Sequence, residues 1–224
     1  MSEKNDNKIH TMWPIYIGEF INTEHQEIKN DLIKFFKEYE KKNPSSRINK
    51  TGEPVENYNL YESQYNLHQE KNPAFEKLLK FISMGFITMS NNANKTSLKS
   101  LVHKDPKFNV KLNETWFIRY DKGGVVFPHN HQNCSWCCVY YVQIGKDSKE
   151  KNGSTYFIKP YTSANSTDFG GANYTYYGTS VVKGEEGKLV IWPNFLYHGS
   201  HPYSGDKDRI IVSANASINL SSTK

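Results

Sequence analysis

Two histidines near the middle of the chain have the spacing of metal ligands. His129 and His131 stand two residues apart in the segment Phe127-Pro-His-Asn-His. Pro128 fixes its own backbone angle and keeps the segment extended. In an extended chain, residues i and i+2 point to the same side, so both imidazoles can reach one ion. The other interpretation of this pair is two surface histidines beside a turn.

A third histidine, His198, follows a hydrophobic segment that ends in a proline turn. A single histidine in such a place is usually structural, but the segment Arg209-Ile-Ile-Val-Ser lies close behind it. With a period of two, Arg209 and Ser213 share one face of that strand with Ile211 and Asn215. A guanidinium and a hydroxyl on a hydrophobic strand are costly to bury unless an anion meets them. A carboxylate fits, because the guanidinium fork binds it through two hydrogen bonds and the serine can donate beside it.

Short strands must position these side chains. From Thr115 onward, β-type runs alternate with turns that contain glycine or proline. The runs are Thr115 to Tyr120, Ser135 to Gln143, Thr155 to Lys159, Thr179 to Val182, Lys188 to Trp192 and Arg209 to Ala216. Several short strands with no helix between them predict a sandwich or jelly roll. The expected fold class is therefore mainly β with N-terminal helices.

Two helices are expected before residue 110. The first runs from about Glu24 to Lys42 behind a capping box at 23–26. The second begins at Asn72-Pro73, where proline tolerates the first helical turn. Their apolar faces are Ile28, Leu32, Phe35, Phe36 and Tyr39, and Phe75, Leu78, Leu79, Ile82 and Phe86. A strand at 13–17 precedes them and a polar loop at 44–58 joins them. We expect residues 1–110 to support a core of residues 111–224 within one folded unit.

Composition and charge narrow the classes of protein. The net charge is +5 over 224 residues, and lysine and glutamate are intermixed, which is typical of a solvated surface and not of a nucleic-acid interface. No segment has the length of a membrane span, and the polar start of the chain is not a signal peptide. Cys134, Cys137 and Cys138 form an odd, clustered set. We therefore expect buried free thiols in a reducing cytoplasm, without disulfides or a zinc site.

The order of these features resembles a known family. The segment Tyr120-Asp-Lys-Gly-Gly-Val-Val-Phe-Pro-His-Asn-His, followed by His198 and Arg209, is similar to the signature of the iron(II)/2-oxoglutarate-dependent dioxygenases, and within them to the prolyl-4-hydroxylase-like branch. The segment Cys138-Val-Tyr-Tyr-Val-Gln looks like the strand that follows the family's first histidine motif. Arg209 follows His198 by eleven residues and Ser213 follows Arg209 by four, as in that family. The resemblance covers 116–217 and extends to poorly characterised bacterial and phage oxygenases.

This resemblance implies a double-stranded β-helix, or jelly roll, that binds iron(II). The implied metal ligands are His129, His131 and His198. The implied contacts of the co-substrate 2-oxoglutarate are Arg209, Ser213, Tyr141 and Tyr120, and ascorbate is a further implied cofactor. The implied reaction uses oxygen to hydroxylate a protein or small molecule and releases succinate and CO2. The implied location is the cytoplasm, or the host cytoplasm if a phage encodes the chain.

One position departs from the family's pattern. The usual iron ligands are two histidines and one carboxylate, and His131 stands where the carboxylate is expected. Three outcomes are open: His131 ligates as a third imidazole, water completes a set of two histidines, or a distant acid such as Asp121 or Asp206 supplies an oxygen.

The remaining histidines are weaker candidates. His201 competes with His198, since both lie in the same tail, but the offset to Arg209 favours His198. The others are expected at the surface: His10, His25, His68 and His103.

Two other functions fit the same pattern. Cupin-type thiol dioxygenases share the β-helix and bind iron through three histidines, but that interpretation leaves Arg209 and Ser213 without a partner. A non-catalytic jelly roll, such as a carbohydrate-binding or virion-associated module, would carry these histidines incidentally. The aromatic segment from Phe169 to Tyr177 is typical of a substrate-side loop or of a solvated surface loop.

Overall fold

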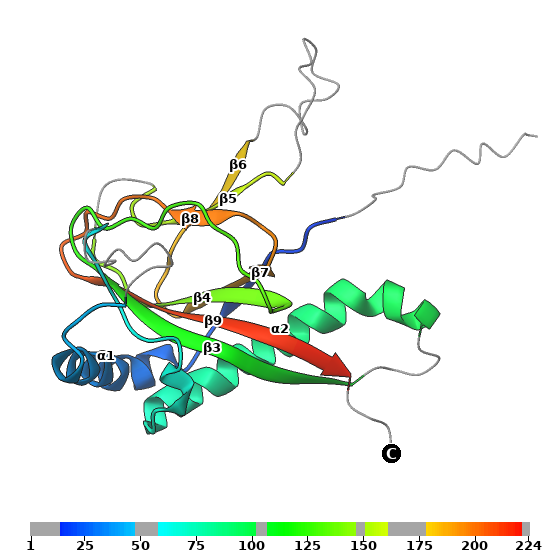
Figure 1. Cartoon of the computed structure of the whole chain (residues 1–224), viewed down its shortest axis with the longest axis horizontal. Helices are drawn as coiled ribbons and strands as arrows, with labels where there is room; N and C mark the ends of the chain where they lie inside the picture. Colours follow the sequence, from blue (N-terminus) through cyan, green and yellow to red (C-terminus); the bar gives the residue numbers. More distant parts are fainter. Residues whose placement is uncertain (1–13, 48–57, 102–106, 147–150, 161–177, 221–224) are drawn as a thin grey trace, which may run out of the picture.

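The computed structural model describes residues 14–47, 58–101, 107–146, 151–160 and 178–220, and these form three layers. A six-stranded antiparallel sheet lies in the middle, with α1 and α2 on one face and a three-stranded sheet over the other (Figure 1). The strand order is β1-β7-β4-β9-β3-β2 in the large sheet and β6-β5-β8 in the small sheet. The expected fold class, mainly β with N-terminal helices, is confirmed.

All six strand runs expected from the sequence are strands. The large sheet contains β1 (Gly18–Ile21), β2 (Leu60–Glu62), β3 (Phe108–Tyr120), β4 (Trp136–Gln143), β7 (Lys188–Pro193) and β9 (Arg209–Leu220). The small sheet contains β5 (Thr155–Ile158), β6 (Thr179–Val182) and β8 (His198–Ser200). β3 and β9 are longer than expected because they pair with each other from Phe108↔Leu220 to Tyr120↔Arg209.

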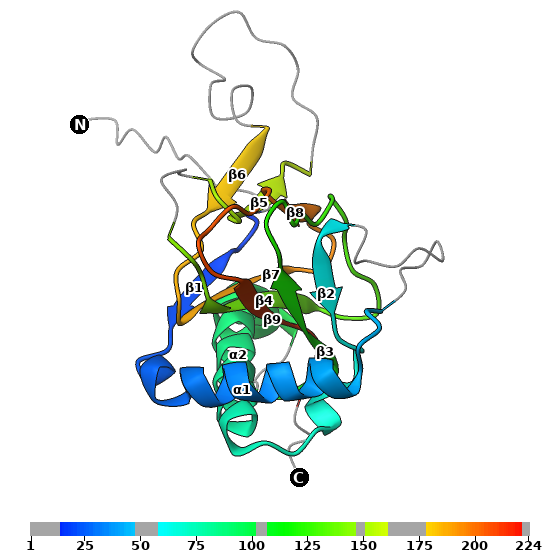
Figure 2. The ribbon, with the colours of Figure 1, turned by 90° about the vertical axis from the view of Figure 1, so that its left-hand side faces the viewer.

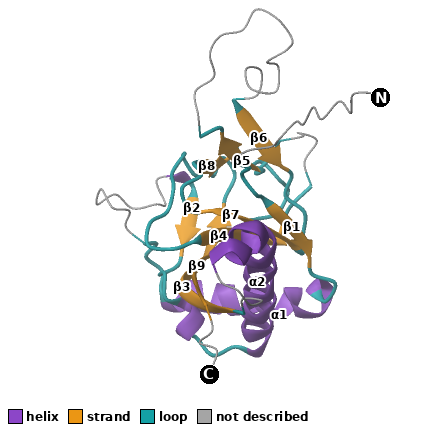
Figure 3. Cartoon of the chain, turned by 90° about the vertical axis from the view of Figure 1, so that its right-hand side faces the viewer, coloured by secondary structure: helices purple, strands orange, loops and turns teal. Residues whose placement is uncertain are grey.

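The helix layer consists of α1 (His25–Lys42) and α2 (Pro73–Leu101), which cross on the same face of the large sheet (Figures 2 and 3). A single turn, η2 (Leu67–Gln69), precedes α2. The expected apolar faces are confirmed, and their buried members are Ile28, Leu32, Phe36, Tyr39, Phe75, Leu78, Ile82 and Phe86. The Asn72 side chain accepts a hydrogen bond from the Phe75 N–H at 3.0 Å, so the expected start of α2 is also confirmed.

Two expectations at the N-terminal end are wrong. The capping box of α1 does not form, because the N-cap is Glu24 without a side-chain bond, and Asn22 Oδ1 accepts from the Glu24 N–H instead. The first strand begins at Gly18, and residues 14–17 are not in a strand. β1 is an edge strand that pairs with β7 from Gly18↔Ile191 to Ile21↔Lys188. Its position therefore depends on a distant partner, which a local pattern does not reveal.

One histidine assigned to the surface is buried. The Nδ1 atom of His25 lies 2.8 Å from the hydroxyl of Tyr140, to which Asn22 also donates. The ring is buried because the start of α1 packs on β4, and Tyr140 gives it a polar partner there. His68 is half-buried, with Nδ1 at 3.2 Å from Thr115 Oγ1. His10, His103, most of the loop at 44–58 and the segment from Phe169 to Tyr177 lie outside the described residues.

The expected burial of the strand cysteines is confirmed. Cys137 and Cys138 are buried in β4, Cys134 is half-buried just before it, and all three are free. Among the described residues, no helix is long and apolar enough to cross a membrane.

β9 has two faces with different surroundings. One row packs in the core beneath the helices: Ile210, Val212, Ala214 and Ala216. The alternate row lines a cavity: Arg209, Ile211, Ser213 and Asn215. This alternation is the expected one, and it places the polar row on the face of the large sheet that looks toward the small sheet.

Candidate active site

Backbone pairing brings two of the candidate histidines together. The N–H of His129 donates to the carbonyl of His198 at 3.0 Å, and the N–H of His198 donates to the carbonyl of His129 at 2.9 Å. A hydrogen-bonded antiparallel pair holds its side chains next to each other on one side. The two imidazole centroids are accordingly 4.4 Å apart, although 69 positions separate the residues in the chain.

The third candidate joins them. The His131 N–H donates to the Asn194 carbonyl at 3.1 Å, which ties this strand to the turn after β7. One ring nitrogen from each of His129, His131 and His198 lies within 4.8 Å of the others. This grouping makes the three imidazoles a candidate site for one metal ion. The spacing argument from the extended Pro-His-Asn-His segment therefore leads to the geometry that the structure has.

The environment suits neutral imidazoles. Burial lowers the pKa of His129, and burial together with the neighbouring His129 lowers that of His198 well below its ordinary value. The Nδ1 atoms face carbonyl oxygens, Phe127 O at 2.8 Å for His129 and Leu196 O at 3.0 Å for His198. A carbonyl accepts only, so Nδ1 carries the proton and Nε2 presents a lone pair to the cluster. These donors fit an iron(II) or similar divalent ion.

The other ligand candidates are elsewhere. Asp121 forms an exposed ion pair with Arg119, and Asp206 accepts a hydrogen bond from the Lys146 N–H at 2.6 Å. His201 packs on the ring of Tyr156, with ring centroids 4.9 Å apart. Among the described residues, only the three-histidine cluster groups three or more metal-binding side chains.

Arg209 lies in the same cavity and is buried. Its side chain is 1% exposed, and its Nε and Nη1 atoms have no hydrogen-bond partner among the described residues. The guanidinium carbon stands 4.1 Å from the centre of the Tyr120 ring and 5.3 Å from that of Tyr141. Gly153 makes room for the arginine stem, because a Cβ there would lie 2.9 Å from Arg209 Cδ. A buried cation with unused donors is suited to bind an anion.

The remaining candidates surround this guanidinium to different degrees. Ser213 and Tyr120 line the cavity with Arg209. Tyr141 is buried beside it, and its hydroxyl is 2.6 Å from Thr155 Oγ1, which lines the cavity. The structure thus brings Tyr120, Ser213 and Arg209 to one cavity, with the Tyr141 ring near the guanidinium.

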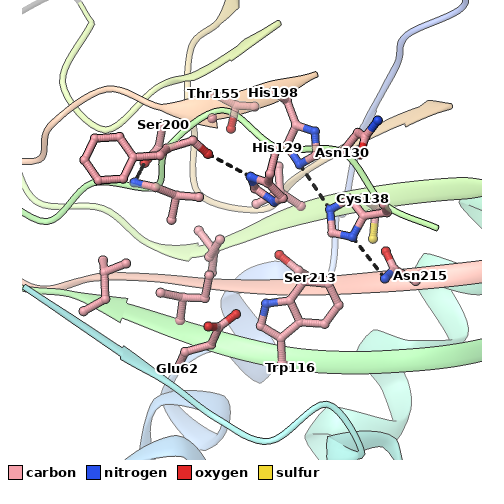
Figure 4. A pocket seen from close by; sticks show the side chains of 18 of the residues that line it. Glu62, Trp116, His129, Asn130, Cys138, Thr155, His198, Ser200, Ser213 and Asn215 are labelled. Atoms are coloured by element: carbon pink, nitrogen blue, oxygen red, sulfur yellow. Dashed lines mark hydrogen bonds between the residues drawn. The ribbon is translucent and has the colours of Figure 1, made fainter. Parts of the chain in front are cut away.

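The cavity has a volume of about 490 Å³ and continues past the histidines. Figure 4 shows His129 and His198 on one side and Trp116, Ser213 and Glu62 on the sheet opposite. Arg47 binds Glu62 at 2.9 Å and lies 4.2 Å from the centre of the Tyr65 ring. Sequence reasoning missed this end, since Arg47 belongs to a segment that is typical of a plain loop. Trp116 and Asn215 could have been predicted as cavity residues, because the alternation of side chains along each strand places them on the cavity face.

Comparison with known families agrees with this geometry. Residues 114–215 match a family model whose description is "Putative 2OG-Fe(II) oxygenase". This segment is therefore similar to the 2OG-Fe(II) oxygenases. It contains the three histidines, Arg209 and Ser213, and it begins and ends at Glu114 and Asn215. The suspected superfamily is therefore confirmed. No curated protein matches the chain by sequence.

Solved structures share the fold of this chain. A prolyl-4-hydroxylase from Pseudomonas putida has a TM-score of 0.58 at 12% identity, covering 89% of this chain and 91% of its own. HygX from Streptomyces hygroscopicus, with nickel and 2-oxoglutarate bound, has a TM-score of 0.53 at 11% identity, covering 90% and 82%. A prolyl hydroxylase from Trichoplax adhaerens, in complex with a hypoxia-inducible-factor peptide fragment, has a TM-score of 0.54 at 10% identity, covering 89% and 82%. The expected jelly roll of the prolyl-4-hydroxylase type is confirmed.

Proposed function

We propose that this protein is an iron(II)- and 2-oxoglutarate-dependent dioxygenase that hydroxylates a substrate and releases succinate and CO2. The observation that carries the proposal is the placement of Arg209. A buried guanidinium, two of whose nitrogens have no partner in the described part of the chain, shares one cavity with three clustered imidazoles. A metal site beside an anion site, both in one cavity, suits a dicarboxylic keto acid.

Arg209 supplies the anion-binding half. Among the described residues it has no carboxylate partner, so an incoming carboxylate meets a charge that is already desolvated. Charge-assisted hydrogen bonds to such a group are worth about 1.5–3 kcal/mol. The ring of Tyr120 lies against the guanidinium, and Ser213 lines the same cavity and would donate to the co-substrate there. These residues bind and orient the distal carboxylate and exclude water from it.

The histidines supply the metal-binding half. His129 and His198 present Nε2 lone pairs and would hold the ion, with His131 in the third corner of the cluster. When bound, iron and the keto acid activate oxygen for oxidation of a C–H bond, which is chemistry that no side chain provides. The fold does not choose the substrate, because related jelly rolls serve many reactions.

Arg209 also separates this proposal from two rivals. A three-histidine thiol dioxygenase needs no dicarboxylic co-substrate, so it would leave the buried guanidinium unpaired. Production of succinate from 2-oxoglutarate favours our proposal over that one. A non-catalytic jelly roll needs neither feature, and failure to bind any divalent metal would favour it.

The test is anaerobic addition of iron(II) and then 2-oxoglutarate to the purified protein. We expect the weak visible charge-transfer band of an iron–keto acid chelate to appear with the wild-type protein and to be absent with His198→Ala. His201→Ala is the matched control, because it removes an imidazole three residues away that lies outside the cluster, and the band should persist. A wild-type protein that binds iron(II) but shows no band and produces no succinate would refute the proposal.

A further inference from the structure

His131 differs from the other two histidines in what its second nitrogen meets. The Nδ1 atoms of His129 and His198 face carbonyl oxygens, which fixes the proton on Nδ1. The Nδ1 atom of His131 instead lies 3.2 Å from the side-chain amide nitrogen of Asn215. The tautomer of His131 therefore depends on which way the Asn215 amide is turned.

Glu114 decides the orientation of that amide. The same nitrogen of Asn215 donates to Glu114 Oε2 at 2.6 Å. A carboxylate accepts and does not donate, so the NH2 group and not the oxygen of Asn215 must face it. An NH2 group only donates, so the Nδ1 atom of His131 must accept. The proton of a neutral His131 ring is consequently on Nε2.

The third contact agrees with this assignment. The Nε2 atom of His131 lies 3.3 Å from the Nε2 atom of His198, which carries a lone pair. At that distance the N–H of His131 can donate to this lone pair when no ion occupies it. Figure 4 shows this chain of contacts, with Asn215 at one end and His198 at the other. Each contact from Glu114 through Asn215 and His131 to His198 then pairs one donor with one acceptor.

The backbone is built to make this contact. The register of β3 against β9 shifts between Leu112 and Glu114, so that Glu114 stands directly opposite Asn215. A bulge of this kind redirects the side chains that follow it. Asn215 is 2% exposed, and its Oδ1 atom has no hydrogen-bond partner among the described residues. Its amide is thus held by its NH2 group, through Glu114 and His131.

We propose that Glu114 and Asn215 hold His131 as a hydrogen-bond donor and not as a metal ligand. Resting on the function proposed above, iron would bind His129 and His198 only, and water would complete the protein's ligand set. The Nε2–H of His131 would then donate to an oxygen atom of water or co-substrate beside the ion. Glu114 and Asn215 act as positioning residues, through His131.

Ligation of the ion by His131 would require an unfavourable contact between Asn215 and Glu114. For His131 to ligate through Nε2, its Nδ1 must carry the proton and Asn215 must turn its oxygen toward it. That rotation places Oδ1 against the Glu114 carboxylate, acceptor to acceptor, at 2.6 Å. Glu114→Gln removes the obstacle, because a glutamine NH2 can donate to Oδ1. This variant should therefore convert His131 into a ligand.

The experiment counts imidazole ligands on anaerobic iron(II) by X-ray absorption and measures the Kd for iron(II) alone. We expect two imidazoles in the wild-type protein and three in Glu114→Gln, with the Kd lowered about tenfold or more, the usual size of effects from groups behind the ligands. His131→Ala alone should change the Kd for iron(II) by no more than about threefold. Combined with Glu114→Gln, it should abolish the tighter iron(II) binding expected of Glu114→Gln. Glu185→Gln is the matched control, because this exposed glutamate pairs with Lys188 and should change neither readout.

Two outcomes would overturn the inference while leaving the proposed function intact. They are three imidazoles in the wild-type protein, or loss of iron binding in His131→Ala, each with the 2-oxoglutarate band preserved in the wild type. Both readouts use variants other than Glu114→Gln, so they decide the question even if that variant does not fold. A wild-type protein that binds no iron(II) would overturn the proposed function and this inference together.

Discussion

The two faces of the large sheet are built from the same strands and differ in how their polar groups are satisfied. Arg119 and Arg209 show the contrast, since they lie on neighbouring strands one register step apart. Arg119 points toward the helices and is paired, at 2.8 Å from Glu40 of α1. Arg209 points toward the small sheet, and its Nε and Nη1 atoms have no hydrogen-bond partner among the described residues. The arginine on the helix side is thus paired within the chain, whereas the arginine on the cavity side has donors left for a ligand.

The first prediction concerns the loss of a large side chain from the helix-side face. Phe117 is 1% exposed and stacks on Phe36 with ring centroids 4.5 Å apart. Phe117→Ala should lower the free energy of unfolding by about 3–5 kcal/mol, the cost of a large core truncation. Urea unfolding measures this. Where the variant is folded, its Kd for 2-oxoglutarate should be that of the wild type, because Phe117 faces away from the cavity.

Phe195→Ala is the control for that truncation. Phe195 is 52% exposed, so the same change should alter stability by no more than about 0.5 kcal/mol. If Phe117→Ala changed the 2-oxoglutarate Kd of the folded protein tenfold, the two faces would be coupled and the contrast between them would fail.

The second prediction is that removing the charge of Arg209 weakens 2-oxoglutarate binding and stabilises the ligand-free protein. Arg209→Met should raise the Kd for 2-oxoglutarate about 30- to 1000-fold, or about 2–4 kcal/mol, because the bidentate charged contact is lost. The ligand-free protein should become more stable, by about 1 kcal/mol or more, because a buried uncompensated charge is replaced by an apolar chain of similar length. Titration calorimetry and urea unfolding measure the two quantities.

Arg119→Met is the matched control on the other face. It breaks the ion pair with Glu40 and should lower stability while leaving the 2-oxoglutarate Kd unchanged. Loss of stability in Arg209→Met would mean that the guanidinium is satisfied within the protein, and the anion site would be withdrawn.

These two faces also show what a sequence can and cannot reveal. Strand parity alone assigns Arg209 and Ser213 to one face, and the spacing of His129 and His131 alone places both imidazoles on one side of an extended segment. Both signals are local, so they survive without knowledge of strand partners. The roles of Glu114 and Asn215 depend on a register shift between β3 and β9, which no local pattern contains. The open question of the third iron ligand was therefore beyond sequence reasoning.

The burial of His25 also depends on a contact between segments that are distant in the sequence. Its helical position is typical of a surface residue, but the partner that accommodates it, Tyr140, lies 115 positions away. Arg47 and Glu62 likewise meet at one end of the cavity from segments that carry no periodic signal. Contacts between distant segments, and not residue types, account for what was missed.

The smallest expected effect compares buried histidines on the two faces. Burial lowers the pKa of His25, the nearby Glu186 carboxylate raises it to a smaller extent, and the Lys29 ammonium lowers it slightly. The folded protein keeps this ring neutral, whereas the unfolded chain takes up a proton near pH 6.5. Stability should therefore fall as the pH drops below about 6.5, with a slope of at most about 1.4 kcal/mol per pH unit from this one group. His25→Phe should make that slope shallower in urea unfolding between pH 7.5 and 5.5.

Tyr140→Phe separates titration from hydrogen bonding. It removes the hydroxyl that meets His25 at 2.8 Å but leaves the buried ring able to titrate, so it should lower stability by about 1 kcal/mol at both pH values and keep the slope. The slope that persists in His25→Phe should come from the cavity face, where burial lowers the pKa of both His129 and His198. An unchanged slope in His25→Phe would place all of the acid sensitivity on the cavity face. The helix-side ring would then be a packed aromatic whose protonation has no bearing on folding.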